Sequence, residues 1–197
     1  MQVRIVDIRG TWRDVADAAR VTAGMEEGTN QPPSEYRRKM LLCEHSPIRE
    51  ITVTAEWENI PYWVAMHLVR HHLGCQPYVL SQRDDRQIGG QSHEIRKDKP
   101  QDAPVRLRFT FNQQAIISIS RRRLCGQASK ETQEAWIKFI NALRKKEPEL
   151  AEVCVPDCVY RGWCYEYKSC GYHKTRMWAK HVDRYRQGIN GYGGATE

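Results

Sequence analysis

The segment Arg70-His71-His72-Leu73-Gly74-Cys75-Gln76-Pro77-Tyr78-Val79-Leu80-Ser81-Gln82-Arg83-Asp84-Asp85-Arg86 decides how the rest of this sequence is interpreted. It follows the apolar run Tyr62–Val69, which has the character of a helix that packs in a core. The segment combines imidazole, guanidinium, thiol and hydroxyl groups, which bind anions and make hydrogen bonds. We interpret it as a functional loop that leaves the end of a packed helix. The alternative is a solvated basic turn.

The length and charge of the chain limit its class. With 197 residues, a single domain over residues 1–187 is expected, followed by a flexible, glycine-rich tail over residues 188–197. The net charge of +7 favours an anionic partner, namely a nucleic acid, a nucleotide or a phosphorylated cofactor. The first residues resemble a strand rather than a signal peptide, and no apolar run approaches the roughly 20 residues that span a bilayer. A cytoplasmic protein is therefore expected.

The hydrophobic periodicity predicts an α+β protein. Alternation of apolar and polar residues predicts strands at 2–8, 48–57 and 105–111. Helical spacing predicts helices at 11–23, 34–43, 62–69, 112–125, 130–146 and 178–185. Ser34 and Asn112 are expected to be N-caps, and Pro61 is expected in the first turn of the helix at 62–69. Residues 83–104 and 153–171 are expected to lack regular structure.

Three groups of basic side chains lie at the ends of predicted helices or in the loops after them. They are Arg70 with His71 and His72, Arg83 with Arg86, and the run Arg121-Arg122-Arg123. Arginine suits phosphate because its planar fork makes paired hydrogen bonds. A single group would only complement a helix dipole, whereas three groups indicate a shared anionic ligand.

The cysteines offer two further readings. Seven cysteines, an odd number, argue against a fully paired disulfide framework. Four occur late, near His173, with gaps of three, five and five residues that differ from the usual pairs of zinc sites: Cys154, Cys158, Cys164 and Cys170. We therefore predict reduced structural cysteines and no metal site. Cys75 beside His71 or His72 is an alternative nucleophile, because positive charge lowers a thiol pKa, although catalytic pairs usually come from distant segments.

Five segments between residues 15 and 171 follow one another in an order that a known family shares. They are Ala18-Ala19-Arg20-Val21-Thr22; Ser46-Pro47-Ile48-Arg49-Glu50; Arg70-His71-His72-x-x-Cys75 with Ser81-x-Arg83; Asn112 to Arg123 continued by Leu124-Cys125-x-x-Ala128-x-x-Glu131; and Pro156-Asp157-Cys158 with Cys164-Tyr165-Glu166-x-Lys168-Ser169-Cys170-Gly171. Together they resemble the flavin-dependent thymidylate synthases. This sequence departs from the family pattern where Cys75 replaces a serine, Glu50 a histidine, Ser118 an asparagine and His67 a glutamine.

The resemblance implies an antiparallel-rich sheet flanked by helices and assembled as a homotetramer with shared active sites. It also implies FAD as cofactor, NADPH and methylenetetrahydrofolate as co-substrates, and reductive methylation of dUMP to dTMP. By position, the implied nucleotide contacts are Arg70, Ser81, Arg83, Arg96, Arg123 and His67. Arg123 is also the implied catalytic residue, and Arg20 is expected to support the site. The implied flavin contacts are Ser46, Arg70, His71, His72, Asn112 and Ser118, with Asn112 reaching in from another subunit.

Two other functions stay open at this stage. A related flavoenzyme acting on another pyrimidine nucleotide, such as dCMP, would use the same groups. A basic nucleic-acid-binding protein without catalysis would also present clustered arginines, because mononucleotide and polymer phosphates attract the same side chains.

Overall fold

The computed structural model describes residues 1–83, 85 and 99–190, with the side chains of 188–190 left out of the description. At its centre is a four-stranded antiparallel sheet in the order β1-β2-β4-β3. The strands are β1 Gln2–Arg9, β2 Thr52–Pro61, β3 Cys75–Val79 and β4 Pro104–Asn112. The fold class is thus the predicted mixture of helices and an antiparallel sheet.

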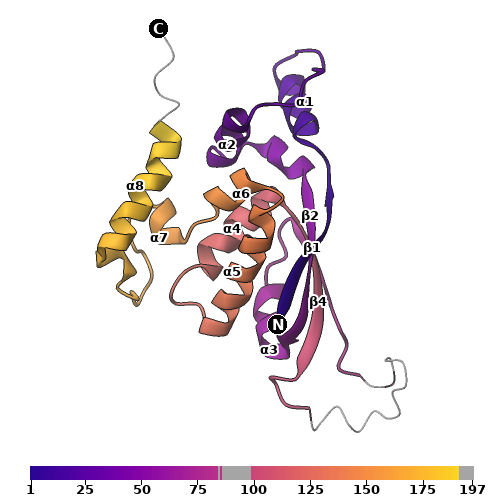
Figure 1. The fold of residues 1–197 in the computed structure, drawn as a ribbon, viewed down its shortest axis with the longest axis vertical. Helices are drawn as coiled ribbons and strands as arrows, with labels where there is room; N and C mark the ends of the chain where they lie inside the picture. The colour runs from indigo at the N-terminus through magenta and orange to yellow at the C-terminus, as the bar shows by residue number, and fades with distance from the viewer. Residues whose placement is uncertain (84, 86–98, 191–197) are drawn as a thin grey trace.

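The helices lie mainly on one side of this sheet. They are α1 Trp12–Thr22, α2 Ser34–Leu42, α3 Tyr62–Val69, α4 Gln113–Arg123, α5 Lys130–Arg144, α6 Pro148–Val153, α7 Asp157–Tyr160 and α8 Arg176–Asn190, with 3-10 turns η1 Ser46–Glu50 and η4 Tyr172–Lys174. Helices α4 and α5 lie beside the strands, and α7 and α8 lie beyond them in a further layer (Figure 1). Helices α1 and α2 lie together at one end of the sheet (Figure 1).

An aromatic cluster fills the space between the sheet and helices α4 and α5. Phe109 and Phe111 of β4 pack with ring centroids 4.2 Å apart, and Trp136 and Phe139 of α5 with centroids 4.8 Å apart. All are fully buried, as is Trp57 of β2. The indole N–H of Trp57 donates to the backbone oxygen of Ala135 in α5 at 3.1 Å. The buried indole therefore has a hydrogen-bond partner for its polar group. These contacts fix α4 and α5 against the sheet.

The opposite face of the sheet is polar and carries a short charge ladder. Glu56 of β2 stands opposite Arg4 of β1 on one side and Arg108 of β4 on the other. Its carboxylate accepts from both guanidinium groups, and only 4% of Glu56 is exposed. The predicted alternation of apolar and polar residues in β2 is therefore correct. Glu56 is on the polar face and is nevertheless buried, because Arg4 and Arg108 cover it.

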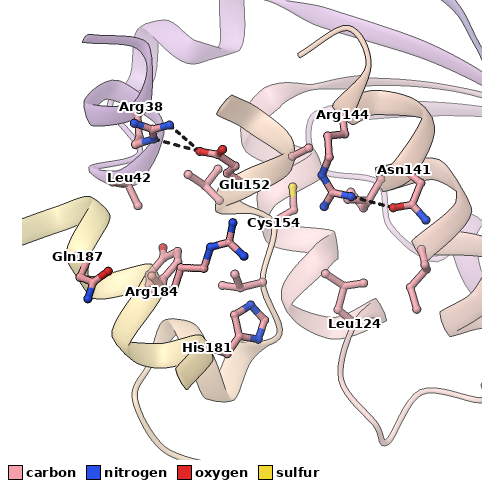
Figure 2. A pocket seen from close by; sticks show the side chains of 16 residues that line it. Arg38, Leu42, Leu124, Asn141, Arg144, Glu152, Cys154, His181, Arg184 and Gln187 are labelled. Carbon is pink, nitrogen blue, oxygen red and sulfur yellow. Dashed lines mark hydrogen bonds and ion pairs between the residues drawn. The ribbon is translucent and has the colours of Figure 1, made fainter. Parts of the chain in front are cut away.

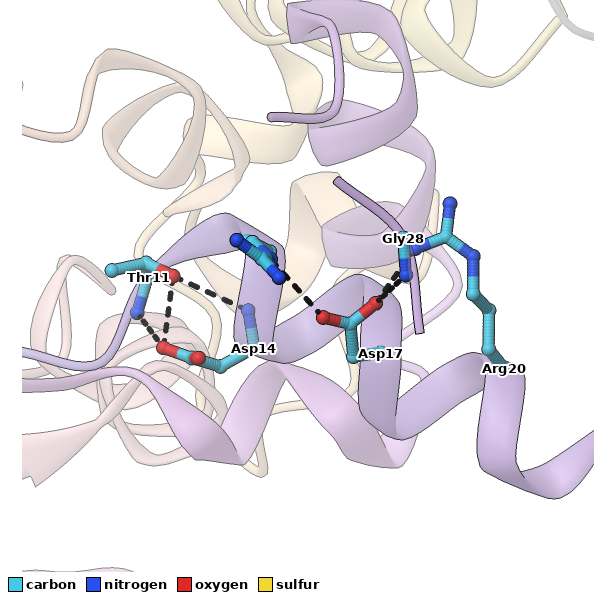
Figure 3. Close-up of polar contacts among 6 residues, drawn as sticks. Thr11, Asp14, Asp17, Arg20 and Gly28 are labelled. Carbon is cyan, nitrogen blue, oxygen red and sulfur yellow. Dashed lines mark hydrogen bonds and ion pairs between the residues drawn. The ribbon is translucent and has the colours of Figure 1, made fainter. Parts of the chain in front are cut away.

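Helix α1 is tied to the loop that follows it. Thr11 and Asp14 form a reciprocal capping box at its first turn (Figure 3). Farther along, one oxygen of Asp17 accepts from the backbone N–H of Gly28 at 2.8 Å and from Arg20 at 2.7 Å (Figure 3). The Gly28 N–H, and then Arg20, hold the pKa of Asp17 below its usual value. Asp17 thus fastens the loop to α1, and Arg20 pairs with the same carboxylate.

The main difference from the sequence prediction is β3. Residues 75–79 lie in the middle of the segment interpreted as a loop, yet they pair with β4 from Cys75 opposite Phe111 to Val79 opposite Leu107. The strand is only five residues long, and Pro77 interrupts its pattern. Proline lacks an N–H and is tolerated because β3 is an edge strand.

The helix boundaries also need corrections. Ser34 is the first helical residue of α2, and Pro33 is at the N-cap, so Ser34 does not cap it. Pro61 ends β2 and is the N-cap of α3. Short helices α6 and α7 occupy parts of 148–160, where α5 was expected to stop and coil to follow. Helix α8 extends to Asn190, into the predicted tail; 191–197 lie outside the described residues. Within the described residues, no helix combines the length and apolarity needed to cross a bilayer.

Candidate functional site

The end of α3 and the end of α4 meet through Arg123. Arg123 is the last residue of α4, and its Nε donates to Nε2 of His71 at 2.8 Å. Its terminal nitrogen donates to the backbone oxygen of His67 at 2.5 Å. The arginine therefore closes the C-terminal end of α3 and links the opening segment to a residue 52 positions away. The predicted site residues Arg123, His71 and His67 are brought together within one chain.

This contact fixes the tautomer of His71. An arginine N–H can only donate, so the Nε2 atom of His71 must accept and the ring proton must be on Nδ1. Burial first, and then the charges of Arg123 and His72, lower the pKa of His71 to about 4. His71 is therefore neutral at physiological pH. It offers a ligand one N–H donor and no positive charge, which differs from the cationic cluster expected from the sequence.

His67 is held from the side of α5. Its Nδ1 lies 3.2 Å from the hydroxyl of the fully buried Thr132, which in turn accepts from Ser129 at 2.7 Å. Burial, followed by Arg70 and Arg123, lowers the pKa of His67. The sequence analysis missed Thr132 and Ser129. The available signal was Ser129 at the N-cap of α5, whose hydroxyl makes no cap bond because it is engaged with Thr132.

Arg70 and Arg123 are close enough for the charge of one to affect the other. Arg70 is exposed directly after α3, and its charge adds to burial in lowering the pKa of Arg123. Within residues 1–83, 85 and 99–190, no carboxylate forms an ion pair with either Arg70 or Arg123. Two neighbouring cations without a described counterion favour the binding of an anion.

Cys75 does not have the properties of a nucleophile. Its sulfur donates to the backbone oxygen of His71 at 3.3 Å, and burial raises its thiol pKa. Burial alone accounts for this shift, so the positive charge expected to lower the thiol pKa has no such effect. His72 is exposed, and its Nδ1 lies 3.2 Å from the Arg70 backbone oxygen. The alternative of a Cys75–histidine pair is therefore wrong.

Ser81 and Arg83 lie at the other end of β3. Strand β3, with five residues and a length of about 17 Å at the usual rise, lies between them and the turn that carries His71. Arg83 forms a two-pronged ion pair with Asp85, at 2.7 and 3.1 Å, and its backbone N–H donates to the Ser81 hydroxyl. The hydrogen bond from Asp85 raises the pKa of Arg83. Within one chain, the predicted nucleotide contacts are thus divided between two places.

Asn112 joins the opening segment to the start of α4. Its Oδ1 accepts from the N–H of Ala115 at 2.8 Å, which confirms the predicted N-cap. A Cβ on Gly74 would lie 2.6 Å from its amide nitrogen, and the Asn112 backbone N–H donates to the Gly74 oxygen at 2.9 Å. The turn from His71 to Gly74 therefore runs beside α4, from Arg123 at one end to Asn112 at the other.

The remaining predicted residues lie apart or outside the description. Ser118 is exposed on α4, one turn after Gln114, and Gln114 donates to Glu44 at 2.5 Å. Ser46, also exposed, follows Glu44 by two residues at the start of η1. The two serines thus flank the Glu44 side of α4. Arg96 lies outside the described residues.

The arginine run at the end of α4 does not act as one cluster. Arg121 pairs with Glu44, and its guanidinium carbon lies 3.5 Å from the centre of the Tyr160 ring. Arg122 pairs with Glu166 at 3.2 Å. Because successive helical residues point in different directions, only Arg123 faces α3. Of this run, only Arg123, the residue predicted to bind the nucleotide, has no carboxylate partner among the described residues, and Arg86 lies outside them.

A cavity of about 830 Å³ lies elsewhere, between α2, α5, α6 and α8 (Figure 2). Cys154 and Arg184 are among the residues around it, and Arg38 is paired there with Glu152 (Figure 2). None of the predicted site residues lines this cavity. The candidate site is instead the open surface formed by the ends of α3 and α4.

Solved structures with similar folds give this surface a context. The flavin-dependent thymidylate synthase from Helicobacter pylori, in two crystal structures with FAD and dUMP, matches with TM-scores of 0.63 and 0.66 at 14% identity. Each match covers 79% of this chain and 100% or 99% of the other. This chain has the fold of the flavin-dependent thymidylate synthases. The UMP/dUMP methylase PolB from Streptomyces cacaoi, bound with 5-Br dUMP, also matches, with a TM-score of 0.57 and 17% identity over 77% of this chain and 93% of that one.

The sequence resemblance and the fold thus agree independently. No family model and no curated protein sequence matches the chain, so the flavin-dependent thymidylate synthase fold is preserved in a strongly divergent sequence. The matched structures are covered almost completely, whereas about a fifth of this chain has no counterpart in them.

Proposed function

We propose that this chain is a flavin-dependent thymidylate synthase that converts dUMP to dTMP. The observation that carries the proposal is the contact of Arg123 with His71, which joins two of the collinear sequence segments at one surface. Arg70 and Arg123, without a described carboxylate partner, would bind the nucleotide there. Arg123 has the additional role of stabilising negative charge that develops on the pyrimidine, because a fixed guanidinium pays little reorganisation during the reaction.

The donors around this surface fit a phosphate-bearing flavin. His71 offers its Nδ1–H, and Asn112 offers its amide nitrogen, since its oxygen is bonded to the cap of α4. Arg70, Ser46 and Ser118 are exposed and would add a cation and two hydroxyls. When bound, FAD would supply a hydride received from NADPH, and methylenetetrahydrofolate would supply the carbon.

A complete site would require more than one chain. Ser81 and Arg83 lie beyond one end of β3 and His71 lies before the other, and the five residues of the strand span about 17 Å. We infer that a single nucleotide does not bridge the two groups within one chain. We propose a homotetramer in which one chain provides Arg70 and Arg123 and another provides Ser81 and Arg83. Closed symmetric assemblies commonly build sites in this way.

The direct test is spectroscopic and uses the purified full-length protein. We expect flavin absorbance after incubation with FAD, a spectral change on addition of dUMP, and NADPH oxidation that dUMP stimulates. A protein that stays colourless with added FAD would contradict the proposal. Salt-dependent binding of DNA or RNA, without any response to mononucleotides, would instead support a nucleic-acid-binding protein.

A second candidate is methylation of another pyrimidine nucleotide. It is favoured by the similar fold of PolB, which is a UMP/dUMP methylase, and by the divergence of His67 and Glu50 from the family pattern. Product analysis with dUMP, UMP and dCMP in parallel would distinguish the two. A methylated product from UMP or dCMP, but not from dUMP, would replace the first candidate with the second.

A further inference from the structure

The cavity between α2, α5, α6 and α8 is separate from the candidate site at the ends of α3 and α4 (Figure 2). Its volume is about 830 Å³. Pockets that hold small molecules have volumes of roughly 300–1,000 Å³. The cavity is open to solvent, because Arg144 of α5 and Arg184 and Gln187 of α8, which line it, are exposed. It therefore has the size and the access that a small-molecule site requires.

The buried part of the cavity wall is apolar. Side chains of α5, α6 and the segment after α6 form it: Ile140, Ala151, Val153, Cys154 and Val155. Burial raises the pKa of the Cys154 thiol to about 12, so this group is protonated and uncharged. None of the five side chains carries a charge. This part of the wall suits the apolar body of a ligand.

Helix α8 forms one side of the cavity and is fixed in place by its own contacts. Val182 is buried with Val155 and Val159 in a small apolar cluster. The hydroxyl of Tyr172 lies 3.2 Å from Nδ1 of His181. These contacts hold α8 at a defined position beside α7 and the segment after α6, so the cavity is formed without a ligand.

Two guanidinium groups from different helices face the cavity. Arg184 reaches into it from α8 and Arg144 from α5 (Figure 2). Arg144 donates to the side-chain oxygen of Asn141 at 2.9 Å, a contact that orients the guanidinium and leaves its charge in place. In the described part of the chain, neither arginine has a carboxylate partner. Both groups are therefore available to an anion.

The other ionisable groups around the cavity add no net charge. Arg38 is paired with Glu152, the only carboxylate among the described lining residues, at 2.7 and 3.1 Å (Figure 2). Burial, and then the charge of Arg184, lower the pKa of His181, so its ring is neutral at physiological pH. Burial raises the pKa of the Tyr185 phenol to about 12, so this group is also neutral. The two guanidinium groups therefore make the cavity positively charged.

We propose that this cavity binds a small organic anion, whose apolar body packs on the buried wall and whose carboxylate or phosphate group binds Arg144 and Arg184. Guanidinium groups make paired hydrogen bonds with both kinds of head group. The apolar body gains from leaving water, and the two arginines select for negative charge. Since none of the predicted site residues lines the cavity, the proposal does not depend on the proposed enzymatic activity.

The test uses anilinonaphthalene sulfonate, a fluorescent organic anion, with the purified full-length protein. Titration should show saturable binding with increased fluorescence. Octanoate and octyl phosphate should each displace the dye at concentrations roughly tenfold below that of octanol, which has the same apolar chain without the charge. The more effective of the two anions identifies the preferred head group. Displacement by octanol at the same concentrations as by the anions would overturn the proposal.

Variants locate the site within the molecule. Arg144→Ala and Arg184→Ala should each weaken binding of the dye about threefold to tenfold, because each removes an exposed charged donor. Arg186→Ala is the matched control, since Arg186 is exposed on the same helix as Arg184 but does not line the cavity. All three residues are exposed, so each variant should keep the wild-type Tm. If Arg144→Ala and Arg184→Ala bind the dye as tightly as Arg186→Ala does, the cavity is not the site.

Discussion

At the scale of single residues, Arg123 differs from its neighbours in what its side chain contacts. Arg121 and Arg122 are each paired with a carboxylate, whereas Arg123 is bound to an imidazole nitrogen and a backbone oxygen. Its charge is therefore not neutralised by the described part of the chain. Replacing it removes a charged donor from the surface, and replacing Arg122 removes only an exposed ion pair.

Arg123→Ala should weaken dUMP binding by roughly tenfold to a hundredfold, since a hydrogen bond to a charged group contributes about 1.5–3 kcal/mol. Isothermal titration calorimetry of the FAD-loaded protein would measure it. The matched control is Arg122→Ala, one residue earlier on α4, which should bind dUMP like the wild type. Equal affinities for the two variants would contradict the role of Arg123.

His71 makes stability depend on pH in a defined direction. Its folded-state pKa is about 4, below its ordinary value of 6.5, so only the unfolded chain takes up a proton on this ring between those values. The resulting stabilisation is complete above pH 6.5 and is lost as the pH falls toward 4. Its upper limit is about 1.4 kcal/mol per unit of pKa shift, and partial exposure to solvent reduces it.

His71→Gln should therefore flatten the decline of unfolding free energy between pH 6.5 and 4, because glutamine can still accept from Arg123 without titrating. Urea denaturation at a series of pH values would measure this. The variant His72→Gln, at an exposed neighbouring position, serves as control and should keep the wild-type profile. A His71→Gln profile that falls as steeply as the wild type would show that this ring does not govern the pH response.

At the scale of elements, the turn between α3 and β3 depends on one glycine. Gly74 has a φ of +70°, and any added Cβ would meet the amide group of Asn112. Gly74→Ala should cost more than the roughly 1–2 kcal/mol of a left-handed alanine alone, because Asn112 must also move.

Gly24→Ala provides the comparison for this prediction. Gly24 has a φ of +66°, but nothing lies within 4 Å of an added Cβ. The loss of stability in Gly24→Ala therefore measures only the cost of placing alanine in the left-handed conformation. Thermal unfolding of the two variants should show a larger decrease in Tm for Gly74→Ala. The same decrease in both would mean that the contact with Asn112 contributes nothing to stability.

Most elements could be predicted from the sequence because their patterns are long and local. The apolar run of α3, the stripe of α5 and the Asn112 cap all depend on neighbours a few positions away. Strand β3 could not be predicted, because a five-residue edge strand with Pro77 acquires its structure from pairing with β4. Local pattern carries no information about a partner that lies many residues later.

The candidate site was also predicted only in part from the sequence. Sequence order and family resemblance identified Arg123, His71 and Asn112, which the fold does bring to one surface. The charge state of His71 was not predictable, since it follows from burial and from the nearby Arg123 guanidinium. Nor could composition show that Arg121 and Arg83 are already paired with carboxylates.

At the scale of the whole molecule, the separation of Arg83 from Arg123 makes the proposed shared site testable. Arg83→Ala and Arg123→Ala should each be nearly inactive alone. Co-expressed with different affinity tags and purified as mixed tetramers, they should recover activity at roughly one site in four, because some sites combine the intact halves of both chains. Steady-state rates of dTMP formation would measure the recovery.

The control for complementation pairs Arg70→Ala with Arg123→Ala. These two residues lie close together on the same chain, so no mixture of the two variants can rebuild an intact half. Recovery in this control, or its absence in the first mixture, would contradict a site divided between subunits along β3.

The ladder of Arg4, Glu56 and Arg108 has a consequence for the alignment of the strands. A shift of β2 by one residue would turn Glu56 toward Phe109 and Phe111 and would leave both arginines unmatched. One carboxylate therefore penalises the misaligned pairing on both of its neighbours at once. A chain that lacks Glu56 would still contain every apolar residue of the sheet. It would no longer have the charged pairing that specifies the register of β2 with β1 and β4.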